Sequence, residues 1–323
     1  MSVKIGVAGA SLMAREGRET FLRYLDTLEE LGWDSVWFSD RIVGAVWRMD
    51  PLAGMAIVAG RTERLRFGTG VLLMSMRSPV TTARELATID LLSNGRLIVG
   101  VGIGQESTVE YDAMGVRKRD RGKRLDEAIR IMRRLWTEDS VTYESEFLKL
   151  TDAGIQVRPK QANVPIWIGS RTEPGLRRTG HLGDGWLPTQ ITPEEIASGI
   201  ERIKHYAAEA GREFADDHYG LQITTYVVEH GRVPDAIKER YLLQRRSDVA
   251  PEQINLLGTP DQVTARLREY IDAGASKFVF NPACGADEMF EQLQLQAEAI
   301  VQPFHQGQGS ALDPQEGRTP VVG

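Results

Sequence analysis

Short hydrophobic runs rich in β-branched residues alternate along the chain with longer segments whose hydrophobic residues recur every three or four positions. The short runs are typical of buried strands and the longer segments of amphipathic helices. This alternation indicates βαβ units around a parallel sheet. The predicted strands are residues 3–8, 35–38, 65–74, 97–104, 165–169, 185–187, 221–228 and 277–280. The predicted helices are residues 18–31, 50–59, 79–92, 121–136, 173–183, a segment beginning at 192, 259–273 and 287–301.

Local signals mark several helix ends. Gly32 follows the first helix directly, where glycine commonly ends a helix. Asp50 precedes Pro51, which combines an acidic N-cap with proline in the first turn. Thr192 is followed three residues later by Glu195, and this pair predicts a capping box.

The continuous alternation of eight strand and helix pairs favours an α/β fold of the (β/α)8 TIM-barrel type over a doubly wound sheet. The 323 residues suffice for two domains or for one barrel, which needs about 250 residues plus insertions. We predict a single barrel over residues 1–303, with a hairpin inserted at 139–150 and a charged insertion at 231–257. The charged insertion is either a lid or a structural surface excursion. Residues 304–323 lack a hydrophobic period, so we expect a flexible C-terminal tail.

Glycines occupy every second position at 100, 102 and 104 of the predicted fourth strand. Because side chains alternate between the two faces of a strand, this spacing leaves one face bare. A ligand or a tightly packed neighbour is expected on that face. A dinucleotide fingerprint is excluded, since the position where its third glycine belongs holds Gln105 or Ser107.

The composition is that of a globular protein, with 41% hydrophobic and 26% charged residues. A net charge of −6 disfavours non-specific binding to nucleic acid. No apolar run approaches the roughly 20 residues of a membrane span. The single cysteine excludes an intrachain disulfide, and the N-terminus lacks the apolar core of a signal peptide. We therefore expect a cytoplasmic protein with neither a membrane nor a nucleic acid as partner.

In a barrel of this kind the active site lies at the carboxyl ends of the strands. The residues that follow the predicted strands are therefore the candidates for chemistry. They are Ala10, Ser11, Ser39, Asp40, Arg41, Met74 to Arg77, Gln105, Glu106, Ser170, Arg171, Pro188, Thr189, Asn281, Pro282 and Cys284.

Residues 169–174 run from a strand end into a helix start, where free backbone amides favour an anion such as a phosphate. Ordinary capping by Thr172 explains the same residues. The basic run at 117–124 is either a solvated helix start or a site for a polyanionic tail. The five histidines show no ligand spacing, so we predict no metal site. Cys284 has no evident partner base and is typical of a small buried residue.

Five blocks, in the same order along the chain, resemble the luciferase-like monooxygenase superfamily and most closely its branch that uses the deazaflavin coenzyme F420. The resemblance extends from about Lys4 to Ala299. The blocks are residues 34–40 (DSVWFSD), 61–70 (RTERLRFGTG), 91–104 (LLSNGRLIVGVGIG), 121–127 (RGKRLDE), and 165–169 (PIWIG) followed by 183–186 (GDGW).

This resemblance implies a (β/α)8 barrel that holds F420 or FMN at the strand ends, commonly as a homodimer. It matches Gly70-Val71 to a strand bulge, often with a non-proline cis peptide, that supports the ring. It also matches Asp40 to an acid near the ring. Further cofactor contacts are implied at Ser39, Ile103, Gly104, Gln105, Gly169, Ser170, Arg171 and Pro188, with Gly169, Ser170 and Arg171 near a phosphate.

Two positions depart from the sugar-phosphate dehydrogenases of the family, which have a histidine and an acid where this chain has Arg41 and Gln105. Arginine stays charged and cannot act as a general base at neutral pH. Arg41 is instead expected to bind an anionic substrate or to stabilise developing negative charge. We assign the catalytic positions to Asp40, Arg41 and Gln105.

The resulting hypothesis is hydride transfer between F420 and a small organic substrate. The alternatives are a two-component FMN-dependent monooxygenase, a flavin-binding protein without turnover, and an unrelated barrel enzyme such as a hydrolase.

Overall fold

The computed structural model describes residues 2–104, 109–242, 246 and 248–306. Among these residues, nine strands form one sheet in which every strand pair is parallel. The strands are β1 (Lys4–Ala8), β2 (Ser35–Phe38), β3 (Arg66–Thr69), β4 (Leu97–Val101), β7 (Ile166–Ile168), β8 (Gly185–Trp186), β9 (Gly220–Val227), β10 (Asn255–Gly258) and β11 (Lys277–Pro282). Their order in the sheet is β10-β9-β11-β1-β2-β3-β4-β7-β8.

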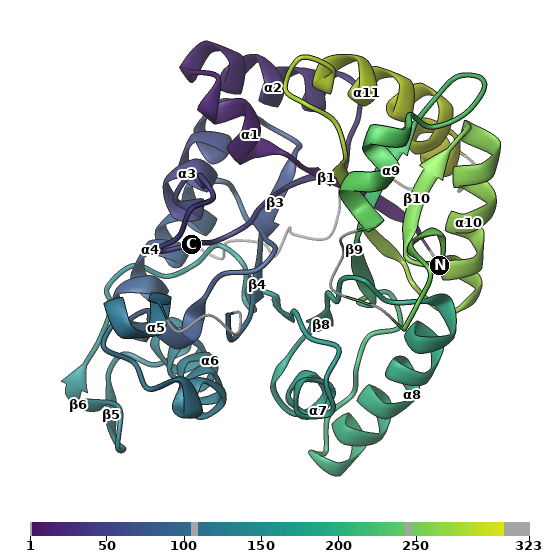
Figure 1. Cartoon of the computed structure of the whole chain (residues 1–323). Helices are drawn as coiled ribbons and strands as arrows, with labels where there is room; N and C mark the ends of the chain where they lie inside the picture. The colour runs from purple at the N-terminus through teal and green to yellow at the C-terminus, as the bar shows by residue number, and fades with distance from the viewer. Residues whose placement is uncertain (1, 105–108, 243–245, 247, 307–323) are drawn as a thin grey trace.

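The sheet closes between β8 and β9. Isolated parallel bridges join Trp186 to Tyr219 and Thr189 to Gln222. The Gln222 amide donates to the carbonyl of Pro188 at 2.8 Å. Eight strands thus complete a ring, which Figure 1 shows with the helices around it, and the predicted (β/α)8 barrel is confirmed.

The ninth strand corrects the expectation for residues 231–257. This segment contains α9 (Asp235–Leu242) and then turns into β10, which pairs with Thr224–Val227 of β9. The physical reason is the short β8, which covers only the first part of that edge of β9. Unpaired backbone groups at a sheet edge need a partner, and β10 provides it.

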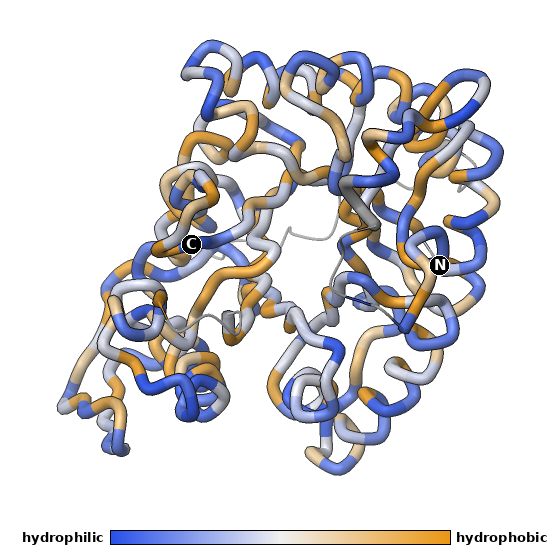
Figure 2. The backbone as a smooth tube through the Cα atoms, in the orientation of Figure 1, coloured by the Kyte–Doolittle hydropathy of each residue, from blue (hydrophilic) through white to orange (hydrophobic). Residues whose placement is uncertain are grey.

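Helices cover the outside of the barrel (Figure 1). Those that follow the strands are α2 (Arg18–Glu30), α3 (Pro51–Arg61), α4 (Pro79–Leu92), α6 (Arg121–Thr137), α7 (Glu173–Leu182), α8 (Pro193–Glu209), α10 (Pro260–Asp272) and α11 (Met289–Gln296). Figure 2 shows hydrophilic residues mainly along the outer turns of these helices. Asp50 caps α3 by accepting from two backbone amides, and Thr192 and Glu195 form the predicted capping box of α8.

Smaller elements complete the chain. The predicted hairpin is confirmed as β5 (Val141–Glu144) and β6 (Lys149–Ala153), which are antiparallel. Two short helices that the hydrophobic pattern did not predict are α1 (Ala10–Arg15) and α5 (Val109–Ala113). A π-helical turn at Ala297–Val301 leads into α12 (Gln302–Gln306), so residues 304–306 are helical. The rest of the expected tail, residues 307–323, lies outside the described residues.

A small apolar cluster lies inside the barrel. It consists of Trp37, Ile98, Trp167, Leu187 and Val279. The Trp37 and Trp167 rings lie 6.5 Å apart between centroids.

Towards the amino ends of the strands, Lys277 forms an ion pair with Asp34. Burial opposes the charge on Asp34, but the neighbouring ammonium outweighs it and lowers the pKa of this carboxyl to about 2.

Strands β3 and β4 end earlier than predicted, at Thr69 and Val101. The glycine spacing explains what happens next. A Cβ on Gly100 would lie 1.9 Å from the carbonyl oxygen of Thr69, and one on Gly102 would lie 2.5 Å from Cγ2 of Val71. At Gly100 and Gly102 the bare face of the glycine run is therefore occupied by the end of β3 and by the Val71 side chain that follows it.

Replacing Gly102 with alanine should destabilise the barrel by about 1–3 kcal/mol, because the added methyl overlaps the stiff, β-branched side chain of Val71. Urea denaturation followed by circular dichroism measures the change. Gly60→Ala in α3 is the matched control, since no atom lies within 4 Å of its Cβ position. That control should stabilise by about 0.5–1 kcal/mol. Equal free energies of unfolding for Gly102→Ala and the wild type would contradict this packing.

Candidate active site at the carboxyl ends of the strands

The mouth of the barrel has a small-residue half and a polar half. Gly70, Gly102 and Gly169 follow β3, β4 and β7, and Cβ positions on the last two lie 2.5 Å from the methyl groups of Val71. On the other half, strand register places Gln222, Thr224 and Asn281 on the interior face of β9 and β11. Val71 thus packs between the segments that follow β4 and β7 on one half, and the other half presents hydrogen-bonding side chains.

The peptide bond between Gly70 and Val71 is cis, as the family resemblance predicts. The segment around it is held from both sides. The Gly70 amide donates to the carbonyl of Phe38 at 2.7 Å, and the Leu72 amide donates to the carbonyl of Gly100 at 2.7 Å. The bulge is thus fixed between β2 and β4 at the barrel mouth.

Asp40 is a buried acceptor at this mouth, with 1% of its side chain exposed. Arg77 donates to both of its carboxylate oxygens, at 3.0 and 3.1 Å, and the Leu73 amide donates at 3.0 Å. Burial disfavours the charge on Arg77, yet hydrogen bonding to Asp40 prevails and raises the pKa of the guanidinium. Asp40 therefore fixes the segment from Leu73 to Arg77 beside the bulge.

Arg41 also has an internal partner. Its Nη1 lies 2.5 Å from Oε2 of Glu110, whose side chain is 2% exposed. The other Glu110 oxygen accepts from the Ile42 amide at 2.9 Å. Sequence reasoning missed Glu110, because its helix α5 has five residues, too few for a recognisable period.

The strand-four edge turns sharply after the glycine run. Gly104 has a φ of +81°, and a Cβ there would lie 2.9 Å from the Tyr111 hydroxyl. Ile103 accepts hydrogen bonds from Tyr111 and, at 3.3 Å, from Ser75. The third predicted catalytic residue, Gln105, lies outside the described residues.

The start of α7 provides a region that suits an anion. Thr172 is the N-cap residue of α7, but its side chain makes no capping hydrogen bond. The Ser170 hydroxyl instead accepts from the Thr172 amide at 3.2 Å. Arg171 donates to the Gln190 carbonyl at 2.9 Å. Burial, and then the nearby Arg246, lower the pKa of Arg171, while Arg246 itself pairs with Glu195 and Asp248.

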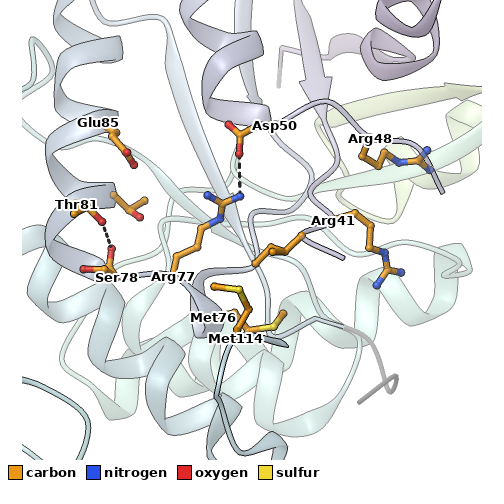
Figure 3. Close-up of a pocket in the computed structure, with 11 residues that line it drawn as sticks. Arg41, Arg48, Asp50, Met76, Arg77, Ser78, Thr81, Glu85 and Met114 are labelled. Carbon is orange, nitrogen blue, oxygen red and sulfur yellow. Dashed lines mark hydrogen bonds and ion pairs between the residues drawn. The ribbon is translucent and has the colours of Figure 1, made fainter. Parts of the chain in front are cut away.

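A cavity of about 480 Å³ opens between the β2–α3 loop and the start of α4 (Figure 3). This volume suits a small organic molecule. Arg77 lies at its centre in the figure, with Asp50 on one side and Met76 on the other. Its wall is formed by Arg41, Ile42, Arg48, Asp50, Met76, Arg77, Ser78, Thr81, Thr82, Glu85 and Met114. The glycines of the mouth are absent from this wall, so the cavity does not include the cis peptide.

Comparison with known proteins identifies the family. A family model described as luciferase-like monooxygenase matches residues 3–241. The chain belongs to this family. An F420-dependent glucose-6-phosphate dehydrogenase from Amycolatopsis mediterranei is 30% identical over 300 residues, which cover 82% of this chain and 89% of the relative.

Solved structures of an F420-dependent dehydrogenase and of a monooxygenase share the fold. An F420-dependent secondary alcohol dehydrogenase in complex with an F420-acetone adduct has a TM-score of 0.80 at 19% identity, covering 94% of this chain and 99% of that one. The monooxygenase RslO1 from Streptomyces bottropensis has a TM-score of 0.79 at 22% identity, covering 93% and 99%.

Other candidate groups of this luciferase-like barrel have structural partners. In the basic run, Arg117 pairs with Asp120 and Glu146. Arg124 donates to the Ser75 carbonyl at 2.9 Å. Cys284 is buried.

The described part of the chain contains no cluster of three or more metal-ligating side chains. None of the helices in this part has the length and apolar character to cross a membrane.

Replacing Asp40 with asparagine should destabilise the protein by about 3 kcal/mol, because it removes the charge of the buried partner of Arg77. Asp50→Asn is the matched control: Asp50 contacts the same guanidinium at 3.3 Å but is 51% exposed, and asparagine also caps helices. The control should change the free energy of unfolding by less than about 1 kcal/mol. Chemical denaturation measures the free energy of unfolding of both variants. Equal losses in the two would contradict the conclusion that Asp40, rather than Asp50, is the main partner of Arg77.

Proposed function

We propose that this luciferase-like protein is an F420-dependent oxidoreductase that transfers a hydride between the deazaflavin and a small organic substrate. The observation that carries the proposal is the Gly70-Val71 bulge at the mouth of the barrel, which is hydrogen-bonded to the ends of β2 and β4 and packs Val71 against Gly102 and Gly169. Relatives that cover most of the chain are named F420-dependent dehydrogenases, and they favour F420.

The residues at the mouth fit such a cofactor. Gly102 and Gly169 make room for the Val71 side chain, which fixes the Gly70-Val71 unit on which we propose that the ring rests. Ser170 and Arg171 lie at the start of α7, where we propose that a phosphate accepts hydrogen bonds. The proposed cofactor contacts are Ser39, Asp40, Gly70, Val71, Ile103, Gly104, Gln105, Gly169, Ser170, Arg171 and Pro188. When bound, the deazaflavin supplies or accepts the hydride.

The chain itself contributes position and charge. Asp40 holds the segment from Leu73 to Arg77 in place through its bonds to Leu73 and Arg77. Arg41 keeps guanidinium N–H groups beyond the one paired with Glu110, and it lines the 480 Å³ cavity. We assign to Arg41 the stabilisation of negative charge on the substrate, and to Gln105 a place beside the ring.

The second candidate is an FMN-dependent monooxygenase. Its support is the fold shared with an oxygenating component of a Baeyer-Villiger monooxygenase in complex with FMN, at a TM-score of 0.75 and 19% identity over 94% of this chain.

We further propose a cytoplasmic homodimer. Exposed apolar side chains on α3 and α4, namely Ile57, Leu91 and Leu92, offer a surface for a second copy.

Titration of the purified protein with F420 and with FMN tests the cofactor. We expect binding of F420 with a dissociation constant of about micromolar order and weaker binding of FMN, followed by F420 fluorescence and FMN absorbance. Tight binding of FMN without a response to F420, together with oxygen consumption when reduced FMN is supplied, would favour the monooxygenase. Tight F420 binding without turnover on a broad substrate panel would indicate a binding protein.

Replacing Arg171 with alanine should weaken F420 binding about tenfold, because a charge-assisted hydrogen bond to phosphate is lost. The salt dependence of binding should fall as well. Arg177→Ala is the matched control, since Arg177 is an exposed arginine on α7 that lies over the Tyr206 ring. The F420 dissociation constant of Arg177→Ala should stay within about twofold of the wild-type value. An unchanged F420 dissociation constant in Arg171→Ala would contradict phosphate binding at the start of α7.

A further inference from the structure

Gln222 reaches across the barrel mouth to the Gly70-Val71 bulge. It lies on the interior face of β9, paired with Val279 of β11 and bridged to Thr189. A Cβ on Gly70 would lie 2.8 Å from Oε1 and 3.1 Å from Nε2 of Gln222. Glycine at position 70 therefore allows the carboxamide to touch the peptide unit on which the cofactor ring is proposed to rest.

Within the described residues, the Gln222 carboxamide has no hydrogen-bond partner, although its backbone amide is bonded to the Pro188 carbonyl. The side chain is half-buried. Gln292 shows the contrast: its carboxamide accepts from the Val227 amide at 3.0 Å and donates to the Val227 carbonyl at 2.8 Å. A half-buried amide without such partners retains its full capacity for a ligand.

We propose that the Gln222 carboxamide forms paired hydrogen bonds with the imide edge of the deazaflavin ring, an assignment that rests on the proposed function. An imide presents an N–H beside a carbonyl oxygen. The carboxamide accepts from the N–H through Oε1 and donates to the oxygen through Nε2. No charge is involved, and both contacts lie next to Gly70.

FMN carries the same imide, so the contact by itself does not choose between the two cofactors. The position beside Gly70 sets the orientation of the ring, because its imide edge then faces β9. Gln222 is thus a cofactor-binding residue on the strand opposite the bulge.

The test compares wild type, Gln222→Leu and the control Thr225→Val in equilibrium binding of F420. Thr225 lies on the same strand, faces outward and is 0% exposed. We expect Gln222→Leu to raise the F420 dissociation constant about tenfold, as expected for hydrogen bonds to a neutral amide. Thr225→Val should remain within about twofold. Circular dichroism confirms that each variant is folded.

A second measurement separates direct contact from a structural role. The bare deazaflavin ring and its N3-methyl derivative, which lacks the imide N–H, serve as probes. Wild type should prefer the unmethylated ring by about tenfold, whereas Gln222→Leu should bind both equally. The same preference in both proteins, or unchanged F420 affinity in Gln222→Leu, overturns the assignment while leaving the proposed function intact. Failure of the wild type to bind F420 or FMN overturns both proposals.

Discussion

The packing of the Val71 side chain against the glycines that follow β4 and β7 is the contact on which the mouth of the barrel depends. Val71 fills the space where side chains at Gly102 and Gly169 would otherwise lie. This joins the segments after β3, β4 and β7 into one unit. Because the core is close-packed, a change at any of these positions moves the others. The cis peptide, the early ends of β3 and β4, and the glycine spacing are three aspects of this one arrangement.

The charged residues around the mouth serve mainly to hold loops in place. Asp40 is occupied by Arg77 and Leu73, and Glu110 by Arg41 and Ile42. Both acids are nearly fully buried, and a buried carboxylate with several donors is a rigid anchor. These anchors fix the loops after β2 and β3 around the proposed cofactor, which would carry the redox chemistry. The groups proposed to bind ligands are a neutral amide, Gln222, and an arginine at the proposed phosphate end, Arg171.

Much of the barrel was predictable from the chain because its signals are local. The alternation of hydrophobic periods predicted the eight barrel strands, and the residues Asp50 and Thr192 predicted helix caps that the structure contains. The order of short motifs predicted the family and the location of the cis peptide. Strand β10 was missed because its hydrophobic run is short and lies within a charged segment. Its pairing depends on the unfilled edge of β9, which no local pattern reports.

The sequence by itself determined the fold class, the family and the set of strand ends, since these follow from period, turn residues and motif order. Tertiary structure decided what each residue at those ends does. Glu110 binds Arg41, 69 positions away, and Gln222 reaches a glycine on the far side of the barrel. Such partners are brought together by ring closure between β8 and β9. The sequence left open whether a ligand or a packed neighbour covers the bare face of the glycine run. The folded barrel decided this at Gly102, because the pairing of β3 with β4 places the Val71 side chain there.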